Sequence, residues 1–133
     1  MKKGWIFFIV LILLTPGVLA LSVSLSAPSS GNTTNMTSII FTCTATDAYA
    51  ISRISLYMNT SSSPWTQVAS QTNASTIANF LVSSLTQGTY IWNCLVYDNI
   101  GLSDWSTNRT FITDIIPPTV NLISPADGNV TSA

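Results

Sequence analysis

Apolar and polar residues alternate along most of the chain between Leu21 and Thr113, and clusters of Ser, Asn, Pro and Gly separate the alternating runs. Alternation with a period of two is typical of strands that turn one face toward a core, and no segment in this region repeats its apolar residues at helical spacing. We expect seven strands, at Leu21–Ala27, Thr37–Thr46, Ile51–Asn59, Trp65–Ala69, Thr76–Val82, Tyr90–Val96 and Trp105–Thr113. The pattern therefore predicts an all-β fold of two packed sheets, with a loop over Pro28–Asn35.

The first twenty residues differ from the rest of the chain, because two lysines precede an unbroken apolar run, Trp5–Leu14. This run is about half as long as the roughly 20 residues that a membrane-spanning helix needs, and the pair Pro16–Gly17 would interrupt its continuation. We therefore predict a helical signal peptide over residues 1–20, with cleavage after Ala20. The alternative is an uncleaved amino-terminal membrane anchor. Both interpretations predict that the remaining residues are exported.

The two cysteines lie on the apolar faces of their predicted strands. Cys43 shares its face with Phe41, and Cys94 shares its face with Trp92, so we expect both sulfur atoms to point inward. In an exported chain such a pair favours a disulfide between the two sheets over the alternative, two free thiols in the core. Closing a loop of about 51 residues would stabilise the fold by about 4 kcal/mol.

The start of the predicted domain recurs near the end of the chain without a gap. Six positions match at a separation of 97 residues: Val23, Leu25, Pro28, Gly31, Asn32 and Thr34 recur as Val120, Leu122, Pro125, Gly128, Asn129 and Thr131. This period suits one β-sandwich and is too long for a solenoid repeat. We expect one sandwich domain over residues 21–116, then a linker and the first strand of a second, truncated repeat over residues 117–133. Neighbouring repeats of the same polypeptide are then the expected partners, and the alternative is that residues 120–123 form a strand donated to another subunit.

Charged residues are scarce after the predicted signal peptide. The only basic residues of segment 21–133 are Arg53 and Arg109. The segment also has five aspartates, so its net charge is −3. This segment has no basic patch to neutralise phosphates, so we exclude nucleic acid as a partner. The chain has no histidine, no glutamate and no serine in a nucleophile-elbow context. Because the common general base is missing and no serine is placed as a nucleophile, we expect no enzymatic activity and no cofactor.

The clearest strand and its surroundings carry a resemblance to a known group of domains. The stretch Leu85–Cys94, with Asp98 and Gly101 after it and Pro117–Pro118 opening the next unit, resembles the immunoglobulin-like and fibronectin-type-III-like repeats of archaeal and bacterial cell-surface proteins. The resemblance implies a seven-stranded immunoglobulin-like β-sandwich. It also implies a tyrosine corner, in which the hydroxyl of Tyr90 bonds to backbone upstream.

Several asparagines are candidate acceptors of N-linked glycans, because they begin Asn-x-Ser/Thr sequons. The six are Asn32, Asn35, Asn59, Asn73, Asn108 and Asn129. A surface rich in hydroxyl and amide groups suits a secreted or cell-surface glycoprotein. The alternative is that the asparagines serve turns and that the Ser and Thr residues serve strands. Asn108 is the least suited acceptor, since we place it in the last strand.

Asp98, Gly101 and Asp104 are a candidate calcium loop, because calcium ions prefer several carboxylate and carbonyl oxygens from one short segment. The sequence Asp-Asn-x-Gly between two predicted strands is, however, first of all the pattern of a tight turn. We therefore expect a turn at Asp98–Gly101 and no metal site.

Tyr57, Trp65 and Trp105 are a candidate platform for saccharides, because flat aromatic faces stack against the C–H faces of sugar rings. The alternative is packing in the core or on a sheet face. Exposed, coplanar tryptophans would favour the platform, and buried ones would favour packing.

Taken together, the sequence predicts a non-catalytic, exported module that acts as a structural spacer or adhesion repeat of a cell-surface or secreted protein. Rigid domains joined by short connectors such as Ile116–Pro118 would project a partner away from the cell. The alternative is an accessory carbohydrate-binding domain of a larger secreted enzyme. Surface glycans and other surface proteins are the external partners to be expected.

Overall fold

A computed structural model of the chain describes residues 20–60, 63–73, 75–121, 123–124 and 128. The predicted signal peptide lies outside this range except for its last residue, Ala20. Within the described residues all regular structure is β-strand. A helix long and apolar enough to cross a membrane is absent from this part of the chain.

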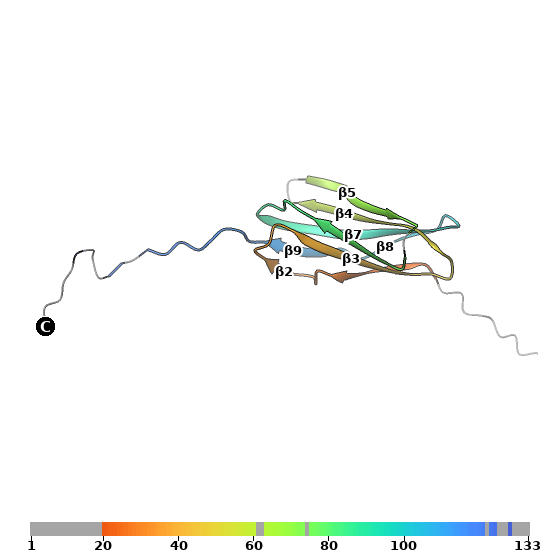
Figure 1. Cartoon of the computed structure of the whole chain (residues 1–133), viewed down its shortest axis with the longest axis horizontal. Coiled ribbons are helices and arrows are strands. Elements are labelled where there is room, and N and C mark those ends of the chain that lie inside the picture. The colour runs from red at the N-terminus through yellow and green to blue at the C-terminus, as the bar shows by residue number, and fades with distance from the viewer. Residues whose placement is uncertain (1–19, 61–62, 74, 122, 125–127, 129–133) are drawn as a thin grey trace, which may run out of the picture.

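The described residues form nine strands arranged in two sheets (Figure 1). The strands are β1 (Ser22–Ala27), β2 (Asn32–Thr34), β3 (Ile39–Thr46), β4 (Ile51–Thr60), β5 (Ser63–Thr72), β6 (Ile77–Val82), β7 (Gly88–Asp98), β8 (Ser103–Trp105) and β9 (Arg109–Thr113). A three-stranded sheet has the order β1-β3-β6, and a six-stranded sheet has the order β2-β9-β7-β4-β5 with β8 also paired to β7. The all-β sandwich expected from the alternation is confirmed.

The described residues contain two more strands than the seven that we predicted. One is β2, which lies inside the segment predicted as a loop and forms by pairing in parallel with Phe111–Thr113 of β9. The other arises because the predicted strand Trp105–Thr113 is divided into β8 and β9, which follow one another along the same edge of β7. Between them Ser106 is buried, and its Oγ accepts a hydrogen bond from the N–H of Cys94. This contact interrupts the regular ladder over residues 106–108.

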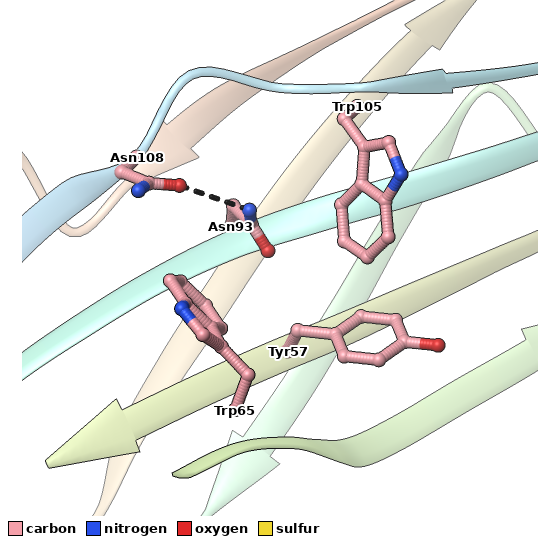
Figure 2. Close-up of a pocket in the computed structure, with 5 residues that line it drawn as sticks. All are labelled: Tyr57, Trp65, Asn93, Trp105 and Asn108. Carbon is pink, nitrogen blue, oxygen red and sulfur yellow. Dashed lines mark hydrogen bonds between the residues drawn. The ribbon is translucent and has the colours of Figure 1, made fainter.

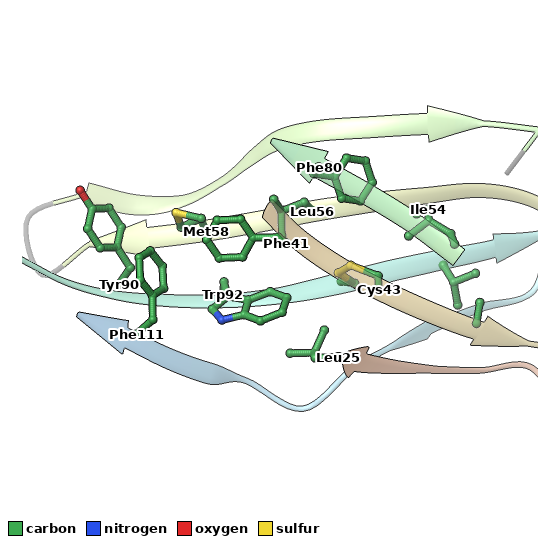
Figure 3. Packing of buried hydrophobic residues seen from close by; sticks show 14 of the residues in the cluster. Leu25, Phe41, Cys43, Ile54, Leu56, Met58, Phe80, Tyr90, Trp92 and Phe111 are labelled. Atoms are coloured by element: carbon green, nitrogen blue, oxygen red, sulfur yellow. A yellow bond between two sulfur atoms is a disulfide. The ribbon is translucent and has the colours of Figure 1, made fainter. Parts of the chain in front are cut away.

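One hydrophobic core fills the space between the sheets (Figure 3). The ring of Phe41 lies edge-on to the rings of Trp92 and Phe111, with centroid distances of 4.9 Å and 5.2 Å. Edge-to-face pairs of this kind contribute about 0.5–1.5 kcal/mol beyond the area that they bury. β3 and β4 bury one face each in this core, with Phe41, Cys43 and Ala45 of β3 and Ile54, Leu56 and Met58 of β4.

The chain enters the sandwich at one end and leaves it at the other (Figure 1). At the entry end, the N–H of Val23 donates to Asp104 of β8, which pairs with Val96 of β7. At the exit end, Thr113 of β9 pairs with Gly88, the first residue of β7. The part of β7 from Gly88 to Val96, which spans the distance between the two ends, is about 27 Å long at the usual rise of a strand.

The start of the segment after β9 is hydrogen-bonded to the domain. The N–H of Asp114 donates to the carbonyl of Thr34 at 2.8 Å. The described residues of 115–128 contain no strand, and Val120 and Ile123 are 83% and 93% exposed. Four of the six recurring positions of the predicted second repeat lie outside the described residues: Leu122, Pro125, Asn129 and Thr131. The strand expected within residues 117–133 therefore stays a prediction.

Candidate functional site

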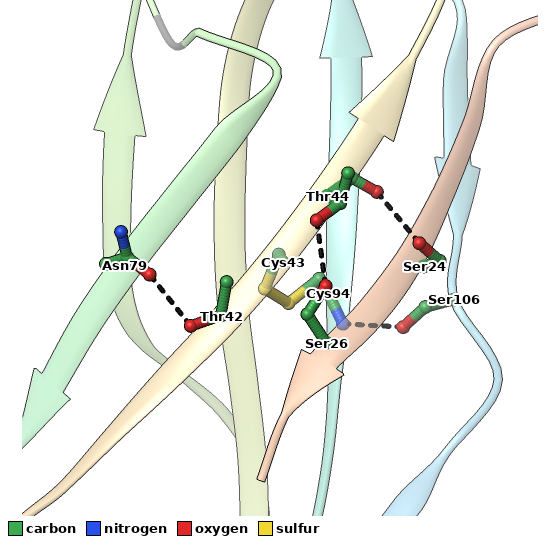
Figure 4. The surroundings of a disulfide bond; sticks show 8 residues. All are labelled: Ser24, Ser26, Thr42, Cys43, Thr44, Asn79, Cys94 and Ser106. Carbon is green, nitrogen blue, oxygen red and sulfur yellow. Dashed lines mark hydrogen bonds between the residues drawn. A yellow bond between two sulfur atoms is a disulfide. The ribbon is translucent and has the colours of Figure 1, made fainter. Parts of the chain in front are cut away.

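Cys43 of β3 and Cys94 of β7 are joined by a disulfide that links the two sheets (Figure 4). Both side chains are fully buried, and their Cα atoms lie 6.4 Å apart although 51 positions separate them in the chain. The Cys94 backbone has a second attachment, because its N–H and its carbonyl form reciprocal 2.9 Å hydrogen bonds with the Oγ and the N–H of Ser106. The bridge therefore lies in the core and connects a strand of each sheet, as the alternation predicted.

The hydroxyl of Tyr90 bonds to the turn four residues upstream. It accepts a hydrogen bond from the N–H of Thr86 at 3.0 Å and donates one to the carbonyl of Thr86 at 3.1 Å. The Tyr90 ring stacks on Phe111, with the centroids 4.8 Å apart and the planes at 13°. The same Thr86 carbonyl also accepts a hydrogen bond from the hydroxyl of Thr113. These contacts tie the turn before β7 to the end of β9, and they have the form that the family resemblance implies for a tyrosine corner.

A pocket of about 380 Å³ lies on the outer face of the six-stranded sheet (Figure 2). Its lining residues are Tyr57 of β4, Trp65 of β5, Asn93 of β7, Trp105 of β8 and Asn108 of the β8–β9 connection. Tyr57 pairs directly with Asn93, and Trp105 pairs directly with Leu95. Because side chains alternate along β7, Asn93 and Leu95 both point away from the core. The sheet register thus brings together side chains from four strands and one loop.

Two tryptophans border this pocket, and both are open to solvent. Trp65 is 41% exposed and Trp105 is 50% exposed. The Trp105 ring meets the Tyr57 ring edge-on, with a centroid distance of 4.8 Å and an angle of 61°. The Tyr57 hydroxyl in turn donates to Oε1 of Gln67 at 3.1 Å. The tryptophans are therefore exposed, as a saccharide site requires, but the inclined rings form the walls of a cleft instead of one flat platform.

The sheet face beneath the cleft is itself packed. Leu95 is only 4% exposed although it points outward, and its direct neighbours on the flanking strands are Ser55 and Trp105. Ser55 is fully buried and donates a hydrogen bond from its Oγ to Oγ of Ser70 at 3.2 Å. A buried leucine next to an exposed indole limits the rotamers that the indole can adopt. Trp105 therefore stands beside a packed part of the sheet face.

Two amide side chains supply polar groups to the cleft. Nδ2 of Asn93 donates to Oδ1 of Asn108 at 2.9 Å. Oδ1 of Asn93 is buried and has no hydrogen-bond partner among the described residues. An apolar cleft with a few amide groups suits a small ligand that has both apolar faces and hydroxyl groups, and sugar rings have this character.

The aspartates of the candidate calcium loop bond to backbone. Oδ1 of Asp98 accepts a hydrogen bond from the N–H of Leu102 at 2.8 Å, across a turn in which Gly101 has a φ of 92°. Oδ2 of Asp104 accepts one from the N–H of Val23 at 3.2 Å. In the part of the chain that the structure describes, no three residues of the types His, Cys, Asp and Glu gather as a metal site. The Asp98–Gly101 segment forms a turn.

Four of the sequon asparagines are exposed: Asn32, Asn35, Asn73 and Asn108. Asn59 of β4 is partly buried, and Asn129 lies outside the described residues. Asn108 is not in the last strand, where we had placed it, but in the connection between β8 and β9. The ladder is interrupted there by the contact of Ser106 with Cys94. The reason for considering Asn108 the least suited acceptor was therefore wrong.

A family model described as Bacterial Ig domain matches residues 22–91, from β1 into β7. The chain belongs to the Bacterial Ig domain family. This confirms the predicted immunoglobulin-like repeat, and an Ig domain of this kind is itself non-catalytic. Disulfides persist in oxidising compartments, so an Ig domain bridged from Cys43 to Cys94 is extracytoplasmic. A comparison with curated proteins finds no match.

Similar solved structures include the fibronectin(III)-like modules of CbhA from Clostridium thermocellum, with a TM-score of 0.58 and 14% identity over 73% of this chain and 100% of that chain. At this identity the likeness shows a common fold only. Two weaker similarities have 14% identity. One is to pectate lyase PelI from Erwinia chrysanthemi in complex with tetragalacturonic acid (TM-score 0.42, 69% of this chain, 28% of that chain). The other is to the PKD domain of an M14-like peptidase from Thermoplasmatales archaeon SCGC AB-540-F20 (TM-score 0.43, 70% of this chain, 91% of that chain).

Sequence reasoning named the three aromatic residues of the cleft, but it missed Asn93 and named Asn108 only as a glycan acceptor. The alternation along β7 already placed Asn93 on the outer face, so part of the signal was present. The neighbours of Asn93 depend on the register of β4 against β7, which shifts between Ile51 and Arg53. A register of this kind cannot be derived from either strand alone.

Proposed function

We propose that this Ig domain is a spacer or adhesion module of a multidomain protein that is secreted or displayed at the cell surface. The main support is that the chain enters the sandwich before β1 at one end and leaves it after β9 at the opposite end (Figure 1). Modules connected in this way extend a polypeptide by one domain length per copy. The recurrence of the Val23–Thr34 pattern at residues 120–131 supports a chain in which such modules follow one another.

The exit of the chain also supports a spacer. Gln87 holds both residues that follow β9, because its Nε2 donates to Oδ1 of Asp114 at 3.2 Å and its Oε1 accepts from the N–H of Ile115 at 2.6 Å. The connector then continues through Pro117–Pro118, and proline-rich segments are extended and stiff. A chain that leaves the domain at a fixed point and continues through a stiff connector limits how the next module can be oriented.

The parallel pairing of β2 with β9 suits a module that carries load between its ends. The N–H of Gly31 donates to the carbonyl of Thr110, and the N–H of Asp114 donates to the carbonyl of Thr34, both at 2.8 Å. A pull on the two chain ends acts along these strands, so it loads the bonds together instead of opening them one after another. If these strands separate, the disulfide still keeps the loop between Cys43 and Cys94 from extending.

Small-angle X-ray scattering tests the spacer function. The full chain is compared with a variant in which residues 22–119 are present twice in tandem. End-to-end modules would increase the maximum dimension by about 35 Å, the length of the 11 residues of β7. A maximum dimension that stays almost unchanged would indicate side-by-side packing and would contradict the proposal.

A second candidate function is an accessory carbohydrate-binding domain of a larger secreted enzyme. The cleft between the exposed Trp65 and Trp105 favours this function, since it is also lined by Asn93, whose Oδ1 has no hydrogen-bond partner among the described residues. Affinity electrophoresis through soluble polysaccharides tests it. Retardation that is lost in Trp65→Ala is the expected result. The matched control is Leu81→Ala, which removes a 67% exposed side chain from the opposite sheet and should leave retardation unchanged. Equal mobility of all three proteins in every polysaccharide would reject the function.

A further inference from the structure

The sequon Asn108-Arg109-Thr110 stands at the rim of the aromatic cleft. Asn59 and Asn73 line other pockets, and no tryptophan lines either of them. Asn108 is thus the described sequon asparagine that shares a pocket with two tryptophans. An acceptor for a saccharide and a cleft with the character of a saccharide site lie side by side on the same sheet face (Figure 2).

The hydrogen bond between Asn93 and Asn108 leaves the required atom available. N-linked glycans are attached through the side-chain nitrogen of asparagine, and in Asn108 it is Oδ1, not Nδ2, that bonds to Asn93. The bond fixes the plane of the Asn108 amide from the oxygen side. In the described part of the chain no hydrogen bond uses Nδ2 of Asn108. The residue is exposed and lies in a connection between strands, where a transferase can reach it.

We propose that Asn108 carries an N-linked glycan and that the first sugar of this glycan packs into the cleft of Tyr57, Trp65 and Trp105. The aromatic cleft is then a docking site for the domain's own glycan. The attachment needs a glycosyl donor activated by a diphosphate and a transferase of the secretory pathway. Nδ2 of Asn108 attacks C1 of the donor sugar and forms the N–C1 bond. The C1–O bond to the diphosphate breaks, the diphosphate leaves with the electron pair, and one amide proton passes to a base of the transferase.

Proximity favours the glycan of Asn108 over a free saccharide. Trp105 lies three residues before Asn108 in the chain, and both side chains line the same cleft. A sugar linked to Asn108 therefore has an effective concentration at the indoles of the order of millimolar or higher, which a free sugar reaches only at high dose. The volume of about 380 Å³ is near the lower end of the usual range for small-ligand sites, so it suits a short saccharide.

The cleft offers the contacts that a sugar ring needs. The indoles of Trp65 and Trp105 present apolar faces to the C–H groups of the ring. Oδ1 of Asn93, which is buried and unpartnered among the described residues, can accept a hydrogen bond from a sugar hydroxyl or acetamido N–H. The docked sugar would cover two tryptophans that otherwise expose 41% and 50% of their surface. The glycan would thus stabilise the fold and remove an exposed apolar patch at the same time.

Matched sequon variants test this inference. The full chain is secreted from a host that attaches glycans through N-acetylglucosamine, as native protein, Thr110→Ser, Thr110→Ala and Thr37→Ala. Thr110→Ser keeps the Asn108 sequon, and Thr110→Ala removes it without touching Asn108. Thr37→Ala removes the sequon of Asn35, which is exposed and does not line the cleft. We expect mass spectrometry to find glycan on Asn108. We expect Thr110→Ala to melt about 3 °C below Thr110→Ser, and Thr37→Ala to melt with the native protein.

The same variants made without glycosylation, in an oxidising compartment, separate the glycan from the side chain. There Thr110→Ala and Thr110→Ser should melt together. A difference of equal size in both preparations would assign the effect to Thr110 itself and overturn the inference. An unmodified Asn108 in a protein whose Asn35 is glycosylated would also overturn it.

Two further measurements address the docking. Trp65→Ala should abolish the gain in melting temperature that the Asn108 glycan gives, whereas Leu81→Ala should keep it. Nuclear Overhauser contacts between the first sugar and the indole protons should appear in the native glycoprotein, and their absence would contradict docking.

Free N,N′-diacetylchitobiose tests whether the cleft binds a free saccharide instead of the domain's own glycan. Saturable binding to the unglycosylated protein well below about 1 mM would assign the cleft to free saccharides, in line with the carbohydrate-binding candidate. The scattering test of the spacer function does not depend on any of these outcomes.

Discussion

Cys43 and Cys94 face each other across the sandwich with their Cα atoms 6.4 Å apart, and their bond closes a loop that contains all of β4, β5 and β6. The strands outside this loop, β1 and β2 on one side and β8 and β9 on the other, lead to the two ends of the chain. The disulfide therefore divides the domain into a covalently closed centre and two arms. A force applied to the two ends of the chain can extend the arms, but it cannot extend the loop that the disulfide closes.

Loss of the disulfide should lower the stability of the domain severely. Replacing both cysteines, as Cys43→Ala with Cys94→Ala, returns to the unfolded chain the entropy of a loop of 51 residues, which is worth about 4 kcal/mol. Domains of this size have only about 5–15 kcal/mol of total stability. Urea unfolding of the native and the double-variant proteins measures the difference. The control is a thiol count in denatured, unreduced native protein, where two free thiols would refute the bridge.

The bond should also set how far the domain extends under force. In a single-molecule experiment the full chain is held between reference domains and pulled to complete unfolding. Without reductant the 51-residue loop stays closed, so the released contour is shorter by about 180 Å than after reduction. Equal extension with and without reductant would mean that the loop is not closed.

Ser106 should be important for stability although it lies in the short connection between β8 and β9. Its Oγ is the acceptor for the buried N–H of Cys94 at 2.9 Å, so Ser106→Ala leaves this donor without a partner. An unsatisfied buried donor costs about 1–3 kcal/mol. Ser103→Ala is the matched control, because Ser103 is exposed, and its free energy of unfolding should change little. Equal losses of unfolding free energy in the two variants would show that the hydrogen bond from Cys94 to Ser106 does not contribute to stability.

The alternation of residues predicted the strands that bury one face. In β3 and β7 the apolar side is unambiguous, and Phe41, Cys43, Trp92 and Cys94 all lie in the core where the alternation placed them. A period of two is a local property of the sequence, so it survives without knowledge of the neighbours. The same locality explains why both cysteines could be assigned to the core before the sheets were known.

Features that depend on distant partners were not predictable in this way. β2 is three polar residues, Asn32–Thr34, and becomes a strand because Phe111–Thr113 pairs with it. The division of the last strand depends on Ser106, whose partner is 12 positions away in another strand. The cleft needs Tyr57 opposite Asn93, and this register follows a shift of β4 against β7 between Ile51 and Arg53. Sequence patterns named the aromatic side chains, and only the sheet register brought the amides beside them.

The hydroxyl of Tyr90 should contribute measurably to stability, whereas that of Tyr57 should not. Tyr90→Phe removes both hydrogen bonds to the backbone of Thr86 and leaves the stack on Phe111 intact. Two partly buried bonds of this kind are worth about 1–2 kcal/mol together.

Tyr57→Phe is the matched control, because its hydroxyl bonds only to the exposed side chain of Gln67 and its ring contact with Trp105 is kept. Urea unfolding of the two variants at equal protein concentration compares them directly. A loss in Tyr57→Phe as large as that in Tyr90→Phe would mean that the turn before β7 does not depend on the Tyr90 hydroxyl. A loss confined to Tyr90→Phe would mean that this one hydroxyl fixes the turn at the end where the chain leaves the domain, since the Thr86 carbonyl that it bonds is shared with Thr113 of β9.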